Sequence, residues 1–585
     1  ADARIESIEL LLQEQIPADA PTEHPRPQPM DSMRGTYTSI SLEPWRVSPD
    51  APYTQVHCLS NGKYSLLITA AGSGFSRWGD IELTRWRADP TLDNWGSWIY
   101  VEDRQNKELW SATREPSTAA PDRNEGRFYP HRVEFERQHG DIVLRTSVNV
   151  AHDENAEIRR VSVINNGNNS RVFALTSYAE VILAPQSVDL HHPAFNKLFI
   201  ESEFLPKEKL LLFRRRPRAA NEKAIYLAHF FVSDDEDINL TGYETDRARF
   251  LGRGGTTRQP FVFSNAGAGL SGTTGATLDP ICALQAEITL PAYQTTQLAF
   301  ITLAATSRKE VLDMARRYRR WSHIRRMRDD VRTHSERELA QLDLTSQKVE
   351  LIQKLLSPLL YPSPALRAEP AVLATNTLGQ PGLWSFSISG DYPILLVRLQ
   401  REENLGLLNE LLLAHTYWRK RGLMIDLVIF NQHETSYEQD FQSKVSRLLA
   451  RTGGDIWLNK RGGIFIVNED KMDEAERILL TTVARVILDG AAGSLEQQLS
   501  KLDTNPVRLP RFVSMEALTP QLDSLPETKK PADLLFDNGL GGFTPDGREY
   551  VIHLQPEQST PAPWINVIAT SEFGCLVSES GMGST

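Results

Sequence analysis

The chain has 585 residues, 40% of them hydrophobic and 24% charged, a length and composition typical of several globular domains rather than one. Its formal net charge of -11 argues against a general affinity for nucleic acids or anionic membranes. Its 3 cysteines lack a CxxC spacing and its 13 histidines are dispersed, which excludes a disulfide framework and disfavours a metal site.

Cofactor and membrane signals are also missing from the sequence. Gly453-Gly454 and Gly462-Gly463 do not form a GxGxxG motif and open no helix. No segment approaches the roughly 18 apolar residues of a membrane-spanning helix, and there is no signal peptide pattern. We therefore expect no metal, no cofactor, no nucleic acid partner and no direct membrane insertion.

Residues 1–45 contain a short amphipathic segment followed by a proline-rich tract, IPADAPTEHPRPQP, which predicts a helix and an extended linker. Such an opening leads us to expect that the chain starts inside a longer parent. Residues 46–306 then alternate apolar and polar positions with period two, and turn residues separate the runs. Many short strands in succession predict a large antiparallel β-sandwich.

The stretch at 60–98 is the most informative part of this region: SNGKYSLLITAAGSGFSRWGDIELTRWRADPTLDNWGSW. Asn61-Gly62 before an alternating run is a strong hairpin signal. Gly72-Ser73-Gly74 interrupts the strand pattern, which indicates a bulge or a close approach of the backbone to something else. A group of aromatic and charged residues follows, and such groups favour sugar rings and hydroxyls: Arg77, Trp78, Asp80, Arg85, Trp86, Arg87, Asp93, Trp95 and Trp98.

The pattern changes to helical at residue 307. Leu312, Ala315 and Tyr318 lie near helical spacing, and interleaved acids make a solvated helix the better interpretation of the arginine-rich run at 307–344 than a nucleic-acid site. We predict a helical linker at 307–365 and an α/β domain at 366–500. Its expected strands are 393–399, 424–430 and 463–467, and its expected helices are 405–419, 437–450 and 473–488. A linker at 501–535 follows.

The last part of residues 536–585 repeats the pattern of the stretch at 60–98. Aligning Gly581-Met582-Gly583 on Gly72-Ser73-Gly74 gives an offset of 509, which is 581 minus 72. Phe573 then falls on Tyr64, while Ser584 opposite Phe75 is a mismatch. We therefore predict that a second, truncated sandwich begins at 536–585. The complete fold expected is a multidomain α+β chain with a large antiparallel super-sandwich, a helical linker, a small α/β layer and the start of a second sandwich.

The stretch at 60–98, together with SISGDYPILLVRL and SYEQDFQSKVSRLL, resembles the family 94 glycoside phosphorylases, and more closely the cyclic β-1,2-glucan synthases that contain such modules. In that family a glycine-rich loop of the N-terminal sandwich reaches toward an active site, often that of a neighbouring subunit. The resemblance therefore implies carbohydrate binding by Gly72, Ser73, Gly74, Phe75, Ser76, Arg77, Trp78, Trp95 and Trp98. The alternative is that these tryptophans and arginines simply pack and pair with acids.

The family's catalytic acid lies in an (α/α)6 barrel within an Asp-Trp-Asn-Asp-Gly-like motif, and this sequence contains no such motif. We therefore expect a region that binds or positions β-glucan beside a phosphorylase-type module without turnover of its own. Two alternatives stay open. One is an active phosphorylase or transglycosylase whose acid, Asp391 or Glu434, lies between sandwich and α/β layer; the other is a purely structural scaffold. For Asp391 a turn that starts a strand is the competing interpretation.

The resemblance implies a β-glucan or oligosaccharide ligand and the remainder of the parent polypeptide as partners, and it leaves a homodimer open. Because phosphorolysis uses intracellular phosphate and the cysteines look reduced, we expect the cytoplasmic side of an inner-membrane parent.

Overall fold

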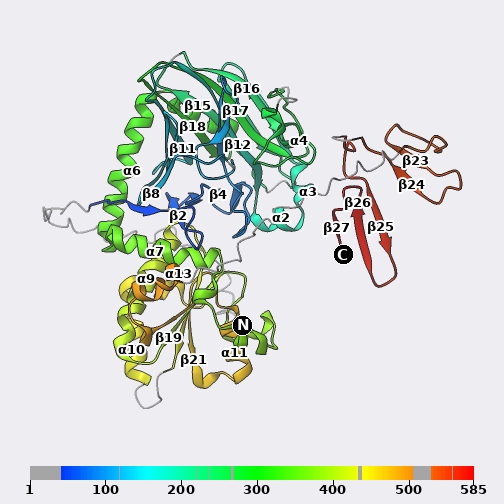
Figure 1. Ribbon diagram of the computed structural model, residues 1–585. Helices are drawn as coiled ribbons and strands as arrows, with labels where there is room; N and C mark the ends of the chain where they lie inside the picture. Colours follow the sequence, from blue (N-terminus) through cyan, green and yellow to red (C-terminus); the bar gives the residue numbers. More distant parts are fainter. Residues whose placement is uncertain are drawn as a thin grey trace, which may run out of the picture. The chain divides into compact units, whose positions relative to one another are not determined.

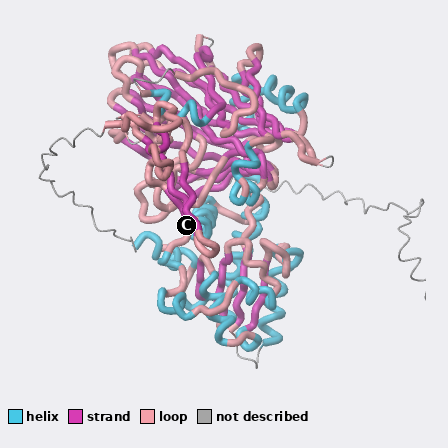
Figure 2. The backbone as a smooth tube through the Cα atoms, turned by 90° about the vertical axis from the view of Figure 1, so that its right-hand side faces the viewer, coloured by secondary structure: helices cyan, strands magenta, loops and turns pink. Residues whose placement is uncertain are grey.

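The computed structural model describes residues 41–585 except 118, 220–221, 236, 265–268, 433–437, 505–528 and 556–557. The predicted N-terminal helix lies outside the described residues. So do most of the proline-rich linker within residues 1–45 and most of the predicted linker at 501–535. Strands dominate up to residue 305, and helices alternate with strands between 394 and 504 (Figures 1 and 2).

Two large antiparallel sheets form the sandwich, as predicted. The first sheet has the order β1 (Trp45–Val47), β8 (Arg123–Tyr129), β9 (Arg132–His139), β10 (Ile142–Val150), β11 (Ala156–Asn165), β18 (Thr295–Ala305), β15 (Ile225–Ser233), β14 (Leu210–Arg215) and β13 (Ile200–Leu205). The second has the order β16 (Asn239–Asp246), β17 (Pro280–Leu290), β12 (Arg171–Ala184), β5 (Ile81–Thr84), β4 (Gly74–Trp78), β3 (Tyr64–Thr69) and β2 (Val56–Ser60), with β6 (Trp98–Asp103) pairing β12 and β7 (Leu109–Ser111).

Period-two alternation explains how these sheets meet. In β9 the apolar positions Val133 and Phe135 are buried, whereas the residues between them are partly exposed. β3 differs because every one of its residues is buried, so both of its faces are covered. The Asn61-Gly62 hairpin is confirmed: it joins β2 to β3, and Gly62 takes a φ of 86°.

The helical region contains a break that the sequence did not predict. Instead of one long helix, α5 (Arg308–Tyr318) ends and α6 (Trp321–Leu342) begins after an extended residue, Arg320. Arg319 donates a hydrogen bond of 3.1 Å to the carbonyl of Phe231, and its guanidinium lies 4.4 Å from the ring centroid of Phe230. These contacts tie the junction to β15, so the single-helix prediction was wrong because a tertiary contact interrupts the local pattern. α7 (Ser346–Leu360) and α8 (Pro370–Thr375) follow.

A four-stranded parallel sheet follows, with the order β21 (Ile464–Asn468), β20 (Asp426–Asn431), β19 (Ile394–Leu399) and β22 (Val486–Asp489). Helices α9 (Leu405–Lys420), α10 (Glu438–Thr452) and α11 (Glu474–Val483) connect these strands, and α12 (Leu495–Leu499) and α13 (Lys501–Thr504) come after them. The predicted helix at 473–488 was too long. It ends at Val483, because the apolar run 486–488 pairs with β19 as an edge strand.

Polar contacts join the sandwich to the helices and the α/β sheet. Ser65 of β3 donates to the carbonyl of Arg421 at 2.8 Å, and Gln353 of α7 accepts from the amide of Cys58 at 3.2 Å. The buried Arg421 in turn pairs with Glu338 of α6 at 2.8 Å. The hairpin formed by β2 and β3 is therefore hydrogen-bonded both to α7 and to the residue that follows α9.

The last fifty residues form two small antiparallel sheets, β23 (Gly541–Phe543) with β24 (Tyr550–Ile552), and β25 (Ile565–Ala569) with β26 (Gly574–Ser578) and β27 (Gly583–Ser584). β25 begins 509 residues after β2 (565 minus 56), the offset found in the sequence. The pairing keeps the same offset: Val56 opposes Thr69, and Ile565 opposes Ser578.

The turn after the second strand also repeats. The amide of Gly72 donates to the carbonyl of Thr69 at 2.9 Å, and the amide of Gly581 donates to the carbonyl of Ser578 at 3.0 Å. Both glycines have positive φ, 93° and 83°. The two β-hairpins thus share strand register and turn geometry.

Candidate functional site

The turn between β3 and β4, residues 70–73, needs Gly72 within it and Gly74 at the start of β4. A Cβ on Gly72 would lie 2.4 Å from the Thr113 side chain, and one on Gly74 would lie 1.8 Å from the carbonyl oxygen of Leu67. Gly74 also has a φ of 146°. The close backbone approach predicted from the Gly-Ser-Gly sequence is therefore present, and the approaching groups are other parts of the chain.

The structure brings the predicted loop and Trp95 together. Ser73 Oγ donates to the carbonyl of Trp95 at 2.5 Å, and the amide of Gly74 donates to the same oxygen at 2.8 Å. Residues Gly72, Ser73, Gly74, Phe75 and Ser76 are buried, whereas Arg77, Trp78 and Trp95 are half-buried.

Trp98 is a correction. Its side chain is only 2% exposed and packs in an aromatic cluster with Tyr100, Tyr178 and Phe250. This indole is not available to a ligand, so packing is the better account of Trp98. Trp86 is likewise buried, with its ring centroid 5.2 Å from that of Phe75.

Two members of the predicted loop have structural partners. Ser76 donates to the buried carboxylate of Glu157, which also accepts from the Tyr64 hydroxyl at 3.0 Å. Burial would raise the pKa of Glu157, but Arg159, 2.6 Å away, and the hydrogen bonds from Ser76 and Tyr64 hold it below its usual range. Arg77 Nη2 donates to the carbonyl of Gly422 at 2.6 Å, so it fastens the loop to the end of α9.

A cavity of about 450 Å³ opens beside this turn, and we call it the Asp93 cavity. Four parts of the sandwich and the end of α7 line it, together with residues from before β2. Its polar lining includes Tyr53, Asp93, Arg114, Glu115, Arg258 and Tyr361, and Ala70 and Ala71 bring the turn itself to the wall.

Asp93 is the central acid of this cavity. Its Oδ2 accepts from Thr69 Oγ1 at 2.8 Å, and its Oδ1 accepts from the Tyr361 hydroxyl at 3.2 Å. Trp86 Nε1 donates to the same Tyr361 oxygen at 3.2 Å, which orients the hydroxyl toward Asp93. Burial raises the pKa of Asp93 to about 6, although hydrogen bonds from Thr69, Ser73 and Tyr361 oppose this rise. The side chain can therefore accept or release a proton near neutral pH.

Glu115 is the second acid, and the turn positions it. Its amide donates to the carbonyl of Ala71 at 3.0 Å, and Arg258 Nη2 lies 3.5 Å from its Oε1. Burial raises the pKa of Glu115, while Arg258 and Arg114 lower it. Its buried Oε2 has no hydrogen-bond partner among the described residues. An acceptor of this kind is suited to a ligand hydroxyl.

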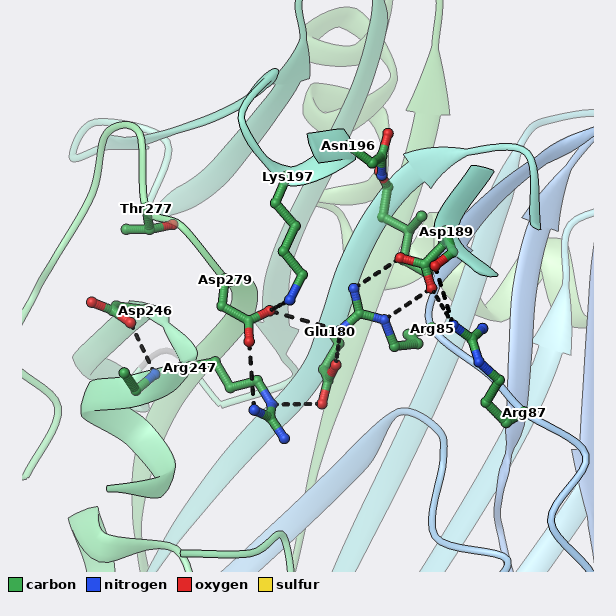
Figure 3. Close-up of polar contacts among 12 residues, drawn as sticks. Arg85, Arg87, Glu180, Asp189, Asn196, Lys197, Asp246, Arg247, Thr277 and Asp279 are labelled. Carbon is green, nitrogen blue, oxygen red and sulfur yellow. Dashed lines mark hydrogen bonds and ion pairs between the residues drawn. The ribbon is translucent and has the colours of Figure 1, made fainter. Parts of the chain in front are cut away.

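A separate network of charged side chains holds Arg85 and Arg87, which precede Asp93 in the chain (Figure 3). Arg85, directly after β5, pairs with Glu180 of β12 at 2.6 Å and with Asp189 of the short helix α2 (Gln186–His191) at 2.9 Å. Arg87 reaches the other oxygen of Asp189 at 2.8 Å. Lys197 and Arg247 complete the network by pairing with Asp279 at 2.7 Å and with Glu180 at 2.8 Å, respectively.

The inner part of this network, formed by Arg85, Glu180 and Asp189, is closed to ligands. Asp189 has no exposed surface, and Glu180 and Arg85 are 6% and 8% exposed. Burial would raise the pKa of Asp189, but Arg85 and Arg87 hold it below its usual range, so the carboxylate stays charged. The arginines at 85 and 87, considered in the sequence as possible sugar contacts, pair with acids in this structure.

The two predicted catalytic acids lie away from the Asp93 cavity or outside the described residues. Asp391 is exposed, pairs with Arg461 and accepts from Gln380 at 3.3 Å, and its amide donates to Ser389 Oγ. It therefore takes part in the turn that precedes β19, the structural interpretation weighed above. Glu434 lies outside the described residues.

Sequence reasoning singled out Asp93 only as part of a larger group and missed Glu115, Arg258 and Tyr361. Glu115 follows the short strand β7, while Arg258 and Tyr361 come from segments more than one hundred residues downstream. No local pattern connects these positions, because only the folded sandwich brings them to one cavity.

Two further features are absent from the described residues. No group of three His, Cys, Asp or Glu side chains there is placed to hold a metal ion. None of the helices in the described ranges is long and apolar enough to cross a membrane.

The fold defines a protein with a large antiparallel β-sandwich followed by a parallel α/β sheet. A family model for the supersandwich domain of glycosyl hydrolase 94 matches residues 44–321 and matches again at residues 548–585. The chain belongs to the glycosyl hydrolase 94 supersandwich family, and the predicted resemblance is confirmed.

A relative supports this assignment. The chain is 35% identical over 601 aligned residues to "Cyclic beta-(1,2)-glucan synthase NdvB" of Rhizobium meliloti (strain 1021). The alignment takes in 99% of this chain and 21% of that protein, so the chain spans about a fifth of that relative's length.

Solved structures are more distant. A bacterial glucoamylase complexed with acarbose has a TM-score of 0.30 and 9% identity, covering 55% of this chain and 42% of its own. A putative kojibiose phosphorylase from human microbiome has a TM-score of 0.30 and 10% identity, covering 59% of this chain and 45% of its own. These two likenesses carry no further argument.

Proposed function

We propose that this chain is the sandwich and α/β region of a cyclic β-1,2-glucan synthase-like protein and that it binds β-glucan without turning it over. The ligand site is the Asp93 cavity, where the turn at 70–73 meets Asp93, Glu115 and Tyr361. The remainder of such a protein would supply the phosphorylase-type module beside which the glucan is held. The free thiols of Cys58, Cys282 and Cys575 support a cytoplasmic location.

The polar lining of the cavity is the observation that carries this proposal. A volume of about 450 Å³ falls in the range of small-ligand sites, roughly 300–1,000 Å³. Sugar hydroxyls bind through carboxylate acceptors and guanidinium donors, and Glu115 and Arg258 provide one of each beside Asp93. The adjacent turn is the one that the family resemblance assigns to sugar contact.

We further propose that residues 536–585 begin a second sandwich. The shared register of the two hairpins and the second match of the family model at 548–585 support this domain assignment. Exposure supports it as well. Ile565, Val567 and Ile568 of β25 are 54%, 64% and 56% exposed, whereas Val56 and Leu59 of β2 are 2% and 3% exposed. A strand of this composition normally has its apolar face covered.

Glucan binding is tested by titrating β-1,2-glucooligosaccharides into the full chain while tryptophan fluorescence is recorded. Trp86 contacts Tyr361 and Trp95 contacts the turn, so we expect a saturable change in emission. Asp93→Asn should weaken binding, and Asp391→Asn, an exposed acid remote from the cavity, is the matched control. A flat response to both linear and cyclic chains would reject glucan binding and favour a purely structural scaffold.

A second candidate function is catalysis, and one observation favours a different acid from those first predicted. The pKa of Asp93 is raised to about 6, which suits a general acid at neutral pH. The full chain would then release glucose 1-phosphate from β-1,2-glucooligosaccharides and phosphate, and Asp93→Asn would abolish the release. Product at the level of an enzyme-free blank would exclude this candidate and agree with binding alone.

A further inference from the structure

A second, smaller cavity lies on the first sheet, where β9 and β11 face helix α6. Its volume is about 220 Å³. Its lining consists of four arginines and two acids, Arg132, Glu134, Arg160, Arg328, Asp329 and Arg332. In a chain with a net charge of -11, such a concentration of arginines is unusual and calls for a physical explanation.

The acids present do not satisfy all of these arginines. Arg132 Nε donates to Glu134 at 2.7 Å, and Arg332 Nε donates to Glu336, outside the cavity, at 3.0 Å. Arg160 of β11 is half-buried, and its guanidinium makes no hydrogen bond or ion pair with any residue that the structure describes. No nitrogen of this guanidinium is among the buried atoms without a partner, so its donors remain accessible to an anion.

The charges around Arg160 are mostly of its own sign. Burial and the neighbouring Arg328 lower the pKa of Arg160, while Glu134 opposes them. His131, whose Nε2 lies 2.7 Å from Arg132 Nη1, has its pKa lowered to about 3 by burial and by Arg132, so it adds no charge near neutral pH. Glu134 pairs with Arg132, Asp329 with Arg328 at 3.6 Å, and Glu336 with Arg332 from outside the lining, so the positive charge of Arg160 is left without a carboxylate partner among the described residues.

We propose that this cavity binds a phosphate group, as inorganic phosphate or as a phosphomonoester. A phosphate group would supply the anionic partner that Arg160 lacks, and its oxygens match the fork of a guanidinium. Arg160 makes the central contact, and Arg328 and Arg332 of α6 line the same cavity.

The surroundings also indicate what a phosphomonoester would carry. A neighbouring cavity of about 500 Å³ shares Glu134 and Arg160 with this site. The hydroxyls of Ser147 and Ser162 and the paired Arg145 are among its lining residues. The neighbouring cavity of about 500 Å³ has room and hydrogen-bonding groups for a polyhydroxylated substituent, so a sugar phosphate fits the combined site.

Calorimetric titration of the full chain with inorganic phosphate at pH 7.5 and low ionic strength tests the proposal. We expect saturable binding at one site per chain. Arg160→Gln should raise the apparent Kd by at least about tenfold, because it removes the central charged contact. The matched control is Arg316→Gln, which removes a 66% exposed arginine of α5 paired with Asp313 and should change the Kd by less than about twofold.

Both variants are first compared with the unsubstituted chain by circular dichroism and thermal unfolding without phosphate, so that binding is read on folded protein. Absence of saturable phosphate binding to the unsubstituted chain would overturn the proposal, and so would unchanged affinity in folded Arg160→Gln. Glucose 1-phosphate should compete with phosphate for the same site. Failure to compete would contradict the assignment of the neighbouring cavity to the substituent.

Discussion

Asp189→Asn tests whether the buried charge network, rather than local sequence, holds Arg85 and Arg87, which precede Asp93 in the chain. The Asp189 carboxylate accepts two hydrogen bonds from Arg85, at 2.9 and 3.1 Å, and one from Arg87 at 2.8 Å. Removing one partner from a buried ion network costs about 3–5 kcal/mol, because the opposite charge stays buried. Asparagine keeps one acceptor oxygen, so we expect a loss near the lower limit, about 3 kcal/mol.

Urea unfolding at pH 7 measures this loss, with Asp313→Asn as the control. Asp313 pairs with Arg316 on the exposed surface of α5, and its loss should cost less than about 1 kcal/mol. Because the pKa of Asp189 is depressed in the folded state, its stabilisation is present above the unfolded pKa, about 3.9, and disappears as the pH falls through the folded pKa. The free energies of unfolding of Asp189→Asn and of the unsubstituted chain should therefore converge as the pH falls into the acid range. A loss no larger than that of the control would refute the reasoning.

Three further predictions concern single side chains. Gly74→Ala should destabilise the fold by more than about 3 kcal/mol, because the added Cβ would collide with the Leu67 carbonyl. The control is Gly79→Ala, which has a φ of 57° and open space around the added Cβ. It should cost about 1 kcal/mol in the same urea assay. Glu82 is 3% exposed, and burial raises its pKa to about 7. A raised pKa means that stability is lost as the pH rises through 7, so Glu82→Gln should gain about 2 kcal/mol at pH 8.5 and nothing at pH 4; equal effects at both pH values would contradict this. Glucan affinity should change between pH 5 and pH 7 through Asp93, and the Asp93→Asn titration should lack that step.

The sequence was most informative where a local rule dictates the structure. The Asn61-Gly62 turn, the alternation of β9 and the glycine-dependent turn at 72–74 could all be predicted, since each depends on neighbouring residues. The repeat of the first hairpin near the C-terminus was also visible as a fixed offset in glycine positions.

The errors arose where distant residues decide the outcome. The break between α5 and α6 depends on Arg319 reaching β15, and the strand β22 depends on β19 as its partner. The site shows the same division: the turn was predictable, but Arg258 and Tyr361 reach the cavity only through the fold. Trp98 looked like a sugar platform because sequence alone does not distinguish an exposed indole from one in an aromatic cluster.

Hydrogen–deuterium exchange of the full chain, with and without a β-1,2-glucooligosaccharide, probes the proposed glucan site at the level of single segments. The account predicts slower exchange in segments that line or adjoin the Asp93 cavity, residues 48–55, 69–75, 90–95 and 112–116. Unchanged exchange in these segments at saturating oligosaccharide, or protection restricted to the α/β sheet, would contradict it.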